Sequence, residues 1–242
     1  MHARITGIPG LAAILLAAAG VSAAAQSAPT TPYPVMAPVE QYLIPGRDAE
    51  IALARTAAPP SISADAEILI LGRHGYEAAV PGKNGFVCFV ERSWAAGLLD
   101  RQFWNPAIRG PNCFNPPAAR TELIQVLART QWAMAGATHQ QIVDRTKLAW
   151  KRHRFKSPAP EAFSFMLSKQ GNLGDAAGGG PWLPHVMFFI PHGHSANWGA
   201  GKAGSPAIAA EAGTLESTLI FVPVRAWSDG SLAPLVQTPH QM

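Results

Sequence analysis

The 242-residue sequence lacks the short motifs that identify common catalytic classes. It contains no G-x-S-x-G nucleophile elbow, no S-x-x-K set and no H-E-x-x-H zinc-protease motif. Its one glycine triplet, Gly178–Gly180, is not followed by the Lys-Ser or Lys-Thr pair of a phosphate-binding loop. Asp and Glu total only 15, and no glycosidase carboxylate pair stands out among them. The motifs therefore identify no reaction.

Charged side chains are also scarce, at 14% of the chain against a usual value of about 25%. Glycine and proline number 22 each, which is typical of a compact protein with many loops. The formal charge of +4 becomes +3 if the N-terminal segment with Arg4 is removed. This mild basicity does not by itself indicate a nucleic-acid partner.

One long apolar run is present, and it lies at the N-terminus. A basic start at Met1–Arg4 precedes the Leu- and Ala-rich stretch Ile5–Val21, and Ala23 and Ala25 occupy the small-residue positions of a cleavage site. This pattern predicts a cleaved secretory signal over residues 1–25. The alternative is an uncleaved anchor, but a membrane-spanning helix needs roughly 20 apolar residues and this run is interrupted by a proline.

Later apolar runs are short, the longest being Val186–Ile190 and Leu219–Val224, so no transmembrane segment is expected in the mature chain. No cysteine near Ala25 offers a lipid attachment point. We therefore expect an exported protein, periplasmic or extracellular, for which a nucleic-acid partner is not expected.

Only two cysteines occur, Cys88 and Cys113. In an oxidising compartment an isolated pair predicts one disulfide. A bridge over 25 residues stabilises the fold by roughly 3–4 kcal/mol in the loop-entropy treatment. The alternative interpretation is a catalytic thiol, which would have to stay reduced outside the cytoplasm.

The chain divides into the signal, a Pro-rich leader over residues 26–46, and a single domain over residues 47–242. Helical patterns are expected over Arg47–Ala57, from the Asn115 cap to about Ala135, and from the Thr138 cap to about Phe155. Six strands are expected: Glu67–Leu71, Tyr76–Val80, Phe86–Glu91, Ala162–Ser168, His185–Ile190 and Ser217–Val224. The fold class is therefore α+β, with a mainly antiparallel sheet of about six strands and two main helices packed on one face.

Turn residues after the first two strands favour an antiparallel meander of the first three, and residues 97–115 are expected to form a long connection tied back to the sheet by the disulfide. Long Gly/Pro-rich loops, Lys169–Pro184 and Pro191–Gly213, separate the last strands. In His185–Ile190 both faces are mostly apolar, which predicts a central strand with Phe188 in the core.

Three histidines near one another in sequence suggest a zinc site, but an extended strand separates His185 from His192 by roughly 20 Å. Only His192 and His194 could share a metal, with a third ligand such as His74 or Glu211. The alternative is a pair of solvent-facing loop histidines.

The loop before His185 suggests a ligand site, because Asp175, Trp182 and His185 converge on one end of the sheet. An imidazole oriented by a carboxylate could act as a general base there. The alternative is that Trp182 covers the core and His185 merely starts a strand.

Basic residues dominate the last predicted helix, where Lys147, Lys151 and Arg154 follow helical spacing. Such a surface can contact an anionic lipid, polysaccharide or protein partner, or it can be a solvated helix face. Taken together, the sequence favours an exported binding or accessory protein for a small molecule or envelope component, with no cofactor. The alternative function is a metal-assisted hydrolase using zinc at His192 and His194.

The processing prediction can be checked directly. Expressed in a secreting bacterial host, the exported form should begin at Gln26, as read by N-terminal sequencing and intact mass. Replacing Ala25 with leucine should block cleavage, because the peptidase accepts only small residues there. An exported chain that retains residues 1–25 in the unmodified protein would contradict the assignment.

Overall fold

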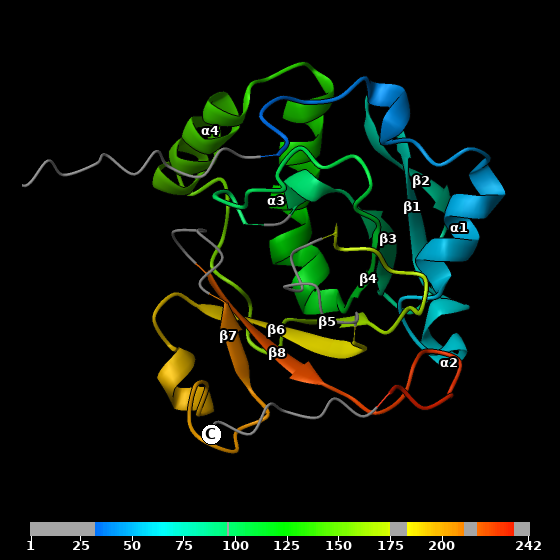
Figure 1. Cartoon of the computed structure of the whole chain (residues 1–242), viewed down its shortest axis with the longest axis vertical. Coiled ribbons are helices and arrows are strands. Elements are labelled where there is room, and N and C mark those ends of the chain that lie inside the picture. Colours follow the sequence, from blue (N-terminus) through cyan, green and yellow to red (C-terminus); the bar gives the residue numbers. More distant parts are fainter. Residues whose placement is uncertain (1–31, 96, 175–182, 211–216, 235–242) are drawn as a thin grey trace, which may run out of the picture. The chain divides into compact units, whose positions relative to one another are not determined.

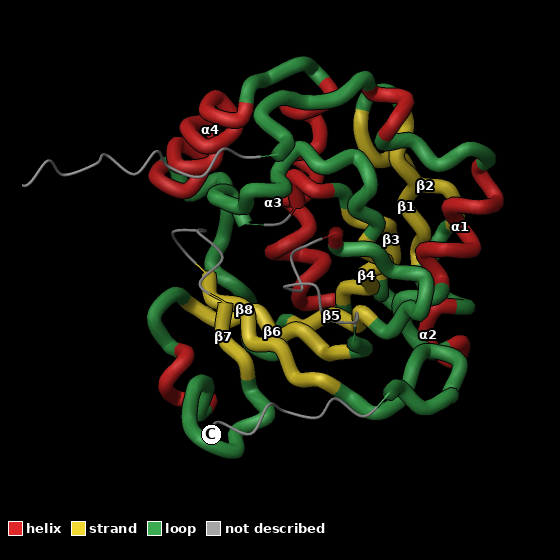
Figure 2. The backbone as a smooth tube through the Cα atoms, viewed as in Figure 1, coloured by secondary structure: helices red, strands yellow, loops and turns green. Residues whose placement is uncertain are grey.

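The computed structural model describes residues 32–95, 97–174, 183–210 and 217–234. Its centre is an eight-stranded sheet in the order β2-β1-β3-β4-β5-β6-β8-β7, in which only the β1–β3 pair is parallel (Figures 1 and 2). The mixed α+β class and the mainly antiparallel sheet are confirmed, with eight strands instead of six. The strands are β1 (Glu67–Gly72), β2 (Gly75–Val80), β3 (Val87–Glu91), β4 (Gly110–Phe114), β5 (Phe163–Met166), β6 (His185–Pro191), β7 (Ile208–Ala210) and β8 (Ser217–Pro223).

The described residues form four α-helices: α1 (Arg47–Arg55), α2 (Pro60–Ser63), α3 (Pro116–Met134) and α4 (His139–Lys151). The α1–α2 side packs on one face through Ala54, Ile68, Cys88 and Val90. The α3 side packs on the other, and α4 covers α3. In Figure 1, β1 to β4 lie beside α3 and β5 to β8 pass beneath it, so the sheet bends around this helix. The expectation of two main helices on one face describes α3 and α4, whereas α1 covers the opposite face.

The two additional strands are β4 and β7. All five residues of β4 are buried between β3 and β5, although Gly110, Pro111 and Asn112 read as turn residues in the sequence. The predicted long connection over residues 97–115 is therefore wrong at its end, where tertiary burial overrides local propensity. Pro111 is tolerated because the β4–β5 pairing covers only the residues after Asn112.

The first three strands do not form a meander. β2 pairs with one edge of β1, and β3 returns to pair in parallel with the other edge. Burial explains this order, because β3 is apolar on both faces and needs a central place, whereas β2 exposes Glu77 and can lie at the edge. The crossing requires glycine at position 82, since a Cβ there would lie 2.3 Å from the Glu67 nitrogen.

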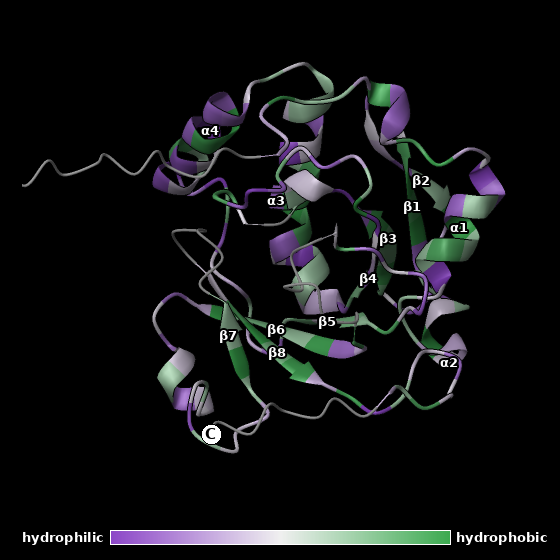
Figure 3. Cartoon of the chain, viewed as in Figure 1, coloured by the Kyte–Doolittle hydropathy of each residue, from purple (hydrophilic) through white to green (hydrophobic). Residues whose placement is uncertain are grey.

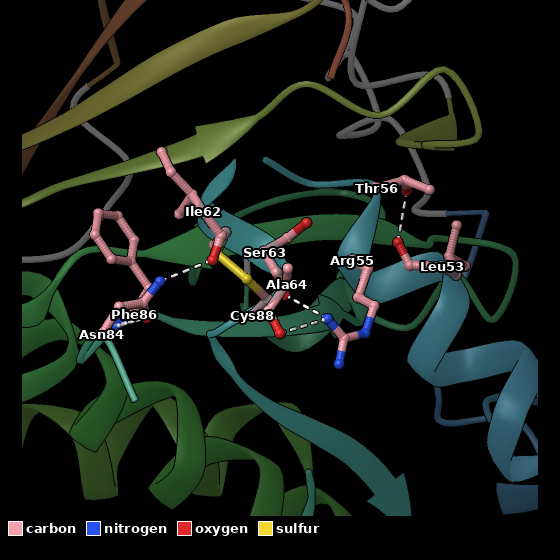
Figure 4. The surroundings of a disulfide bond; sticks show 10 residues. Leu53, Arg55, Thr56, Ile62, Ser63, Ala64, Asn84, Phe86 and Cys88 are labelled. Carbon is pink, nitrogen blue, oxygen red and sulfur yellow. Dashed lines mark hydrogen bonds between the residues drawn. A yellow bond between two sulfur atoms is a disulfide. The ribbon is translucent and has the colours of Figure 1, made fainter. Parts of the chain in front are cut away.

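The predicted disulfide is present between Cys88 and Cys113, which face each other directly across β3 and β4. It therefore joins two neighbouring central strands, not a loose loop to the sheet. The α1–α2 connection covers it, held by Arg55, which donates to the carbonyls of Ser63 and Ala64 (Figure 4). Both sulfurs are fully buried, which favours a structural bridge over a reactive thiol.

The Pro-rich stretch before α1 packs into the core from residue 32 onward. Tyr42 is fully buried against Trp94 and Trp104, and its hydroxyl donates to the Trp104 carbonyl at 2.8 Å. Arg92 in turn donates to the Tyr42 carbonyl at 2.7 Å. The described part of the predicted Pro-rich leader therefore contributes to the core of the domain, because Tyr42 and other apolar residues between the prolines pack into it.

The two long helices start where the sequence predicts. The Asn115 side chain accepts from the Ala118 amide at 3.0 Å, and Thr138 forms a capping box with Gln141. α4 ends at Lys151, earlier than the predicted Phe155, because the chain turns back through His153 at a φ of 54°. Within the part of the chain that the structure describes, no helix is long and apolar enough to cross a membrane.

The central position of β6, between β5 and β8, is confirmed, but Phe189 and not Phe188 is its buried aromatic. Phe189 packs edge-on against Phe114 at a centroid separation of 5.3 Å, while Phe188 lies half-buried beside Trp198. Phe189→Ala should lower the free energy of unfolding by about 3–5 kcal/mol, through lost transfer energy and a cavity. Phe188→Ala should cost less, since its site opens to solvent. Chemical denaturation of both variants tests the order, and equal losses would contradict the assignment of faces.

Candidate functional site

The start of β6 places His185 on the face of the sheet that α3 covers. His185 alternates with the buried core residues Met187 and Phe189, and it is only 8% exposed. Its Nδ1 donates to the Leu183 carbonyl at 2.9 Å, and its ring meets Phe221 edge-on at 5.3 Å. Burial lowers the pKa of His185, and the bond to the carbonyl opposes that shift. Burial therefore favours the neutral imidazole, and the bond to Leu183 holds its ring in one orientation.

Two other polar residues lie at the same end of the same face. Glu91 ends β3 in alternation with Val87 and Phe89, and Asn112 pairs with Phe89 across β4. Strands β3 and β5 run opposite to β4 and β6, so the last residue of β3 and the first of β6 share one end of the sheet. His185 is two strands from Asn112, which is about 10 Å at the usual strand spacing.

α3 adds three polar side chains from above. Glu122, Gln125 and Arg129 follow the i, i+3, i+7 spacing that aligns residues on one side of a helix. They are 2%, 6% and 2% exposed, so this side of α3 faces the sheet and not the solvent. We call Glu91, Asn112, Glu122, Gln125 and Arg129 the α3 polar cluster.

Hydrogen bonds join the members in pairs. The Asn112 amide donates to Glu91 Oε1 at 3.0 Å, and the Gln125 amide donates to Glu122 Oε2 at 2.5 Å. Arg129 interacts electrostatically with both carboxyl groups and so links the two pairs. The cluster is a connected set of polar groups set into the main apolar core.

Three acceptor oxygens of the cluster receive no hydrogen bond from any described residue: Asn112 Oδ1, Glu122 Oε1 and Gln125 Oε1. Rotating the side-chain amide of Asn112 or Gln125 by half a turn would exchange its oxygen and its NH2 group. The NH2 group would then take the unfilled position, but the hydrogen bond that it now donates to Glu91 or Glu122 would be lost. The Ser164 hydroxyl, on the same face of β5, is also buried without a partner in the described chain. Buried polar atoms are rarely left unpaired, since each costs roughly 1–3 kcal/mol.

Another buried charge pair shows how this fold normally treats such groups. Arg92 and Glu50 form a fully buried ion pair at 2.9 Å on the α1 side. Arg92 also donates to the carbonyls of Tyr42 and Val90, and Glu50 accepts from the Leu71 amide. These additional partners make that pair a structural element. The α3 polar cluster lacks equivalent partners for its oxygens among the described residues.

Burial controls the protonation of the α3 polar cluster. It raises the pKa of Glu122 to about 7, while the Gln125 amide and Arg129 act in the opposite direction. It also raises the pKa of Glu91 to about 7, opposed by Asn112 and Arg129. Burial lowers the pKa of Arg129 to about 10, so it remains charged near neutral pH. The carboxyl groups of Glu91 and Glu122 can therefore accept hydrogen bonds and exchange a proton near pH 7.

Comparison with known proteins adds nothing to this geometry. The chain matches no protein-family model, no curated protein and no solved structure. The site is therefore interpreted from its own residues.

Of the predicted ligand residues, the structure places His185 at the same end and face of the sheet as the α3 polar cluster. Asp175 and Trp182 lie outside the described residues, so their predicted convergence on His185 stays a prediction.

The predicted metal residues lie at the other end of β6. His192 and His194 follow its last residue and are exposed. His74 cannot join them, because it lies in the β1–β2 turn, at least four strands away or roughly 19 Å. Glu211 lies outside the described residues. The described residues contain no group of three His, Cys, Asp or Glu side chains placed to hold a metal, and the zinc site stays a prediction.

Sequence reasoning missed the α3 polar cluster. The apolar spacing in the sequence predicts a buried side of α3 made of Leu123, Val126, Leu127, Thr130 and Met134. In the structure Leu123, Val126 and Thr130 are buried as predicted and Leu127 and Met134 are only partly buried, but the buried side also includes Glu122 and Arg129. The one signal in the sequence is the helical spacing of Glu122, Gln125 and Arg129, and spacing alone does not distinguish a buried polar side of a helix from a solvent-facing one.

The raised pKa values predict that stability falls as pH rises. Between about pH 4.5 and 7 the folded protein keeps protons on Glu91 and Glu122 that the unfolded chain has released. For Glu122 alone the loss is roughly 3 kcal/mol over that interval, with little change above it. Glu122→Gln should remove this part of the dependence and stabilise the protein at pH 8. Urea denaturation from pH 5 to 8 measures both effects, and an unchanged slope in the variant would contradict them.

Proposed function

We propose that the protein is an exported binding protein for a small polar molecule, which it holds at the α3 polar cluster. The observation that carries this proposal is the set of buried oxygens of Asn112, Glu122 and Gln125 without donors among the described residues. A ligand that donates hydrogen bonds would supply the missing partners. In the free protein these unpaired oxygens lower the free energy of unfolding, and a ligand that donates hydrogen bonds to them restores this stability.

The chemistry of the α3 polar cluster selects the class of ligand. The three unfilled oxygens of Asn112, Glu122 and Gln125 are acceptors, so a ligand that fills them must carry N–H or O–H groups, as amines, amides and polyols do. Two carboxyl groups with pKa values of about 7 face one charged guanidinium, so the net charge of the cluster is close to zero near pH 7. An anion would bring more acceptor oxygens to these three positions, so a neutral or cationic ligand that carries donors is favoured over an anion. His185, neutral and held by Leu183, supplies a further polar surface at the same end.

The setting of the site agrees with a binding role in the cell envelope. The Cys88–Cys113 disulfide is typical of an oxidising compartment, and the N-terminal pattern predicts export to one. The apolar surroundings of Phe89, Phe114 and Phe189 lower the local dielectric and strengthen each hydrogen bond made there.

A thermal-shift panel tests the proposal. Putrescine, glucosamine and ribitol represent amines and polyols, and succinate and citrate represent anions of similar size. A donor-bearing ligand at 100 times its Kd should stabilise the protein by about 2.7 kcal/mol, or roughly 5–10 °C in Tm. The anions should give no shift. Titration calorimetry on the best ligand then gives its affinity.

Two variants separate a ligand site from a purely structural cluster. Glu122→Gln and Gln125→Met should abolish the ligand-induced shift, and Glu122→Gln should at the same time stabilise the free protein at pH 8. The matched control is Glu77→Gln, which alters an exposed carboxylate on the edge strand β2. The proposal fails if no donor-bearing compound raises Tm, or if the Glu122 and Glu77 variants respond alike.

A further inference from the structure

The segment from Arg145 to Lys156 concentrates positive charge on one part of the surface. It carries six cationic residues, all exposed, and no acidic residue: Arg145, Lys147, Lys151, Arg152, Arg154 and Lys156. We call these six residues the basic patch. The rest of the chain has 13 Lys and Arg against 15 Asp and Glu, so the basicity of the whole protein comes from this segment. Figure 3 shows the hydrophilic bands along α4.

None of the six forms an ion pair with a described residue. Elsewhere on the surface Arg47, Arg73 and Lys169 each pair with a carboxylate. Like charges at helical spacing repel one another by a few tenths of a kcal/mol per pair. The basic patch therefore keeps its full charge available to an external anion.

The segment is held rigidly against the domain, although its last part lies beyond α4. The amide of His153 donates to the Trp150 carbonyl and that of Arg154 to the Ala149 carbonyl, both at 2.9 Å. With His153 in the left-handed region, these bonds form a Schellman turn that folds the chain back beside the last helical turn. Phe155 then packs on Trp150, so Arg154 keeps a defined place beside the helix end.

An exposed leucine lies among these charges. Leu148 is 43% exposed on the solvent side of α4. Asp144, Arg145, Lys151 and Arg152 lie three or four residues from it on the helix surface, so three of its four such neighbours are cations. A soluble polyanion would satisfy the cations but leave this side chain in water, whereas the boundary between headgroups and acyl chains accommodates both. Leu148 therefore favours a lipid surface over a soluble polymer.

From these observations we propose that the basic patch docks the protein onto a membrane surface rich in anionic phospholipid. The cations contact headgroup phosphates, and Leu148 enters the boundary with the acyl chains. This inference does not rest on the proposed ligand site, because it uses the outer side of α4 and the turn after it. The two proposals can fail separately.

Vesicle sedimentation of the purified protein tests the docking. Binding to phosphatidylcholine vesicles that contain phosphatidylglycerol should exceed binding to pure phosphatidylcholine, and it should be lost at about 1 M salt, where the Debye length is about 3 Å. Each surface cation contributes about a fivefold change in partitioning. Combining Lys147→Gln, Lys151→Gln and Arg154→Gln should therefore weaken binding by roughly a hundredfold.

The control variant removes the same charge elsewhere, through Arg73→Gln, Lys83→Gln and Lys202→Gln on exposed loops. It should retain most of the binding, and circular dichroism with Tm confirms that both triple variants fold. Leu148→Gln should weaken vesicle binding severalfold without changing binding to soluble polyphosphate. Equal losses in the two triple variants would overturn the proposal. Unchanged vesicle binding by Leu148→Gln, with tight polyphosphate binding, would overturn it in favour of a soluble polyanion.

Discussion

The packing of α3 into the bend of the sheet is the contact on which the rest of the fold depends. Phe89 of β3, Phe114 of β4 and the pair Met187 and Phe189 of β6 form one buried cluster with Leu123 and Val126 of this helix. Burial of apolar surface of this extent supplies the main driving force of folding. The disulfide joins the central strands β3 and β4, and the α1 side packs on the opposite face of the sheet around it.

The packing of α3 on the sheet also buries polar side chains, which lowers the stability of the fold. Glu122, Gln125 and Arg129 occupy places on α3 where apolar side chains of similar size would be more favourable. Proteins tend to violate local packing rules at functional sites and to compensate elsewhere. Here the apolar core around the polar groups supplies the stability that offsets their burial. The buried Arg92–Glu50 ion pair, by contrast, has hydrogen-bond partners within the protein.

The two proposed contacts use electrostatics in opposite environments. At the α3 polar cluster, low dielectric makes each unpaired oxygen costly and each ligand hydrogen bond strong, which favours selectivity for donors. At the basic patch, water and salt weaken every single charge, so six cations must act together to give useful affinity. The first contact should tolerate salt and the second should not.

The sequence by itself determined the features that depend on neighbouring residues. The caps at Asn115 and Thr138, the central apolar strand from His185 and the pairing of Cys88 with Cys113 follow from local patterns and from cysteine count. Tertiary structure alone decided the place of β3 beside β1, the burial of the turn-like residues of β4 and the side of α3 that faces the core. Each of these depends on contacts between residues distant in sequence, whose energies outweigh local propensity by amounts that no short pattern records.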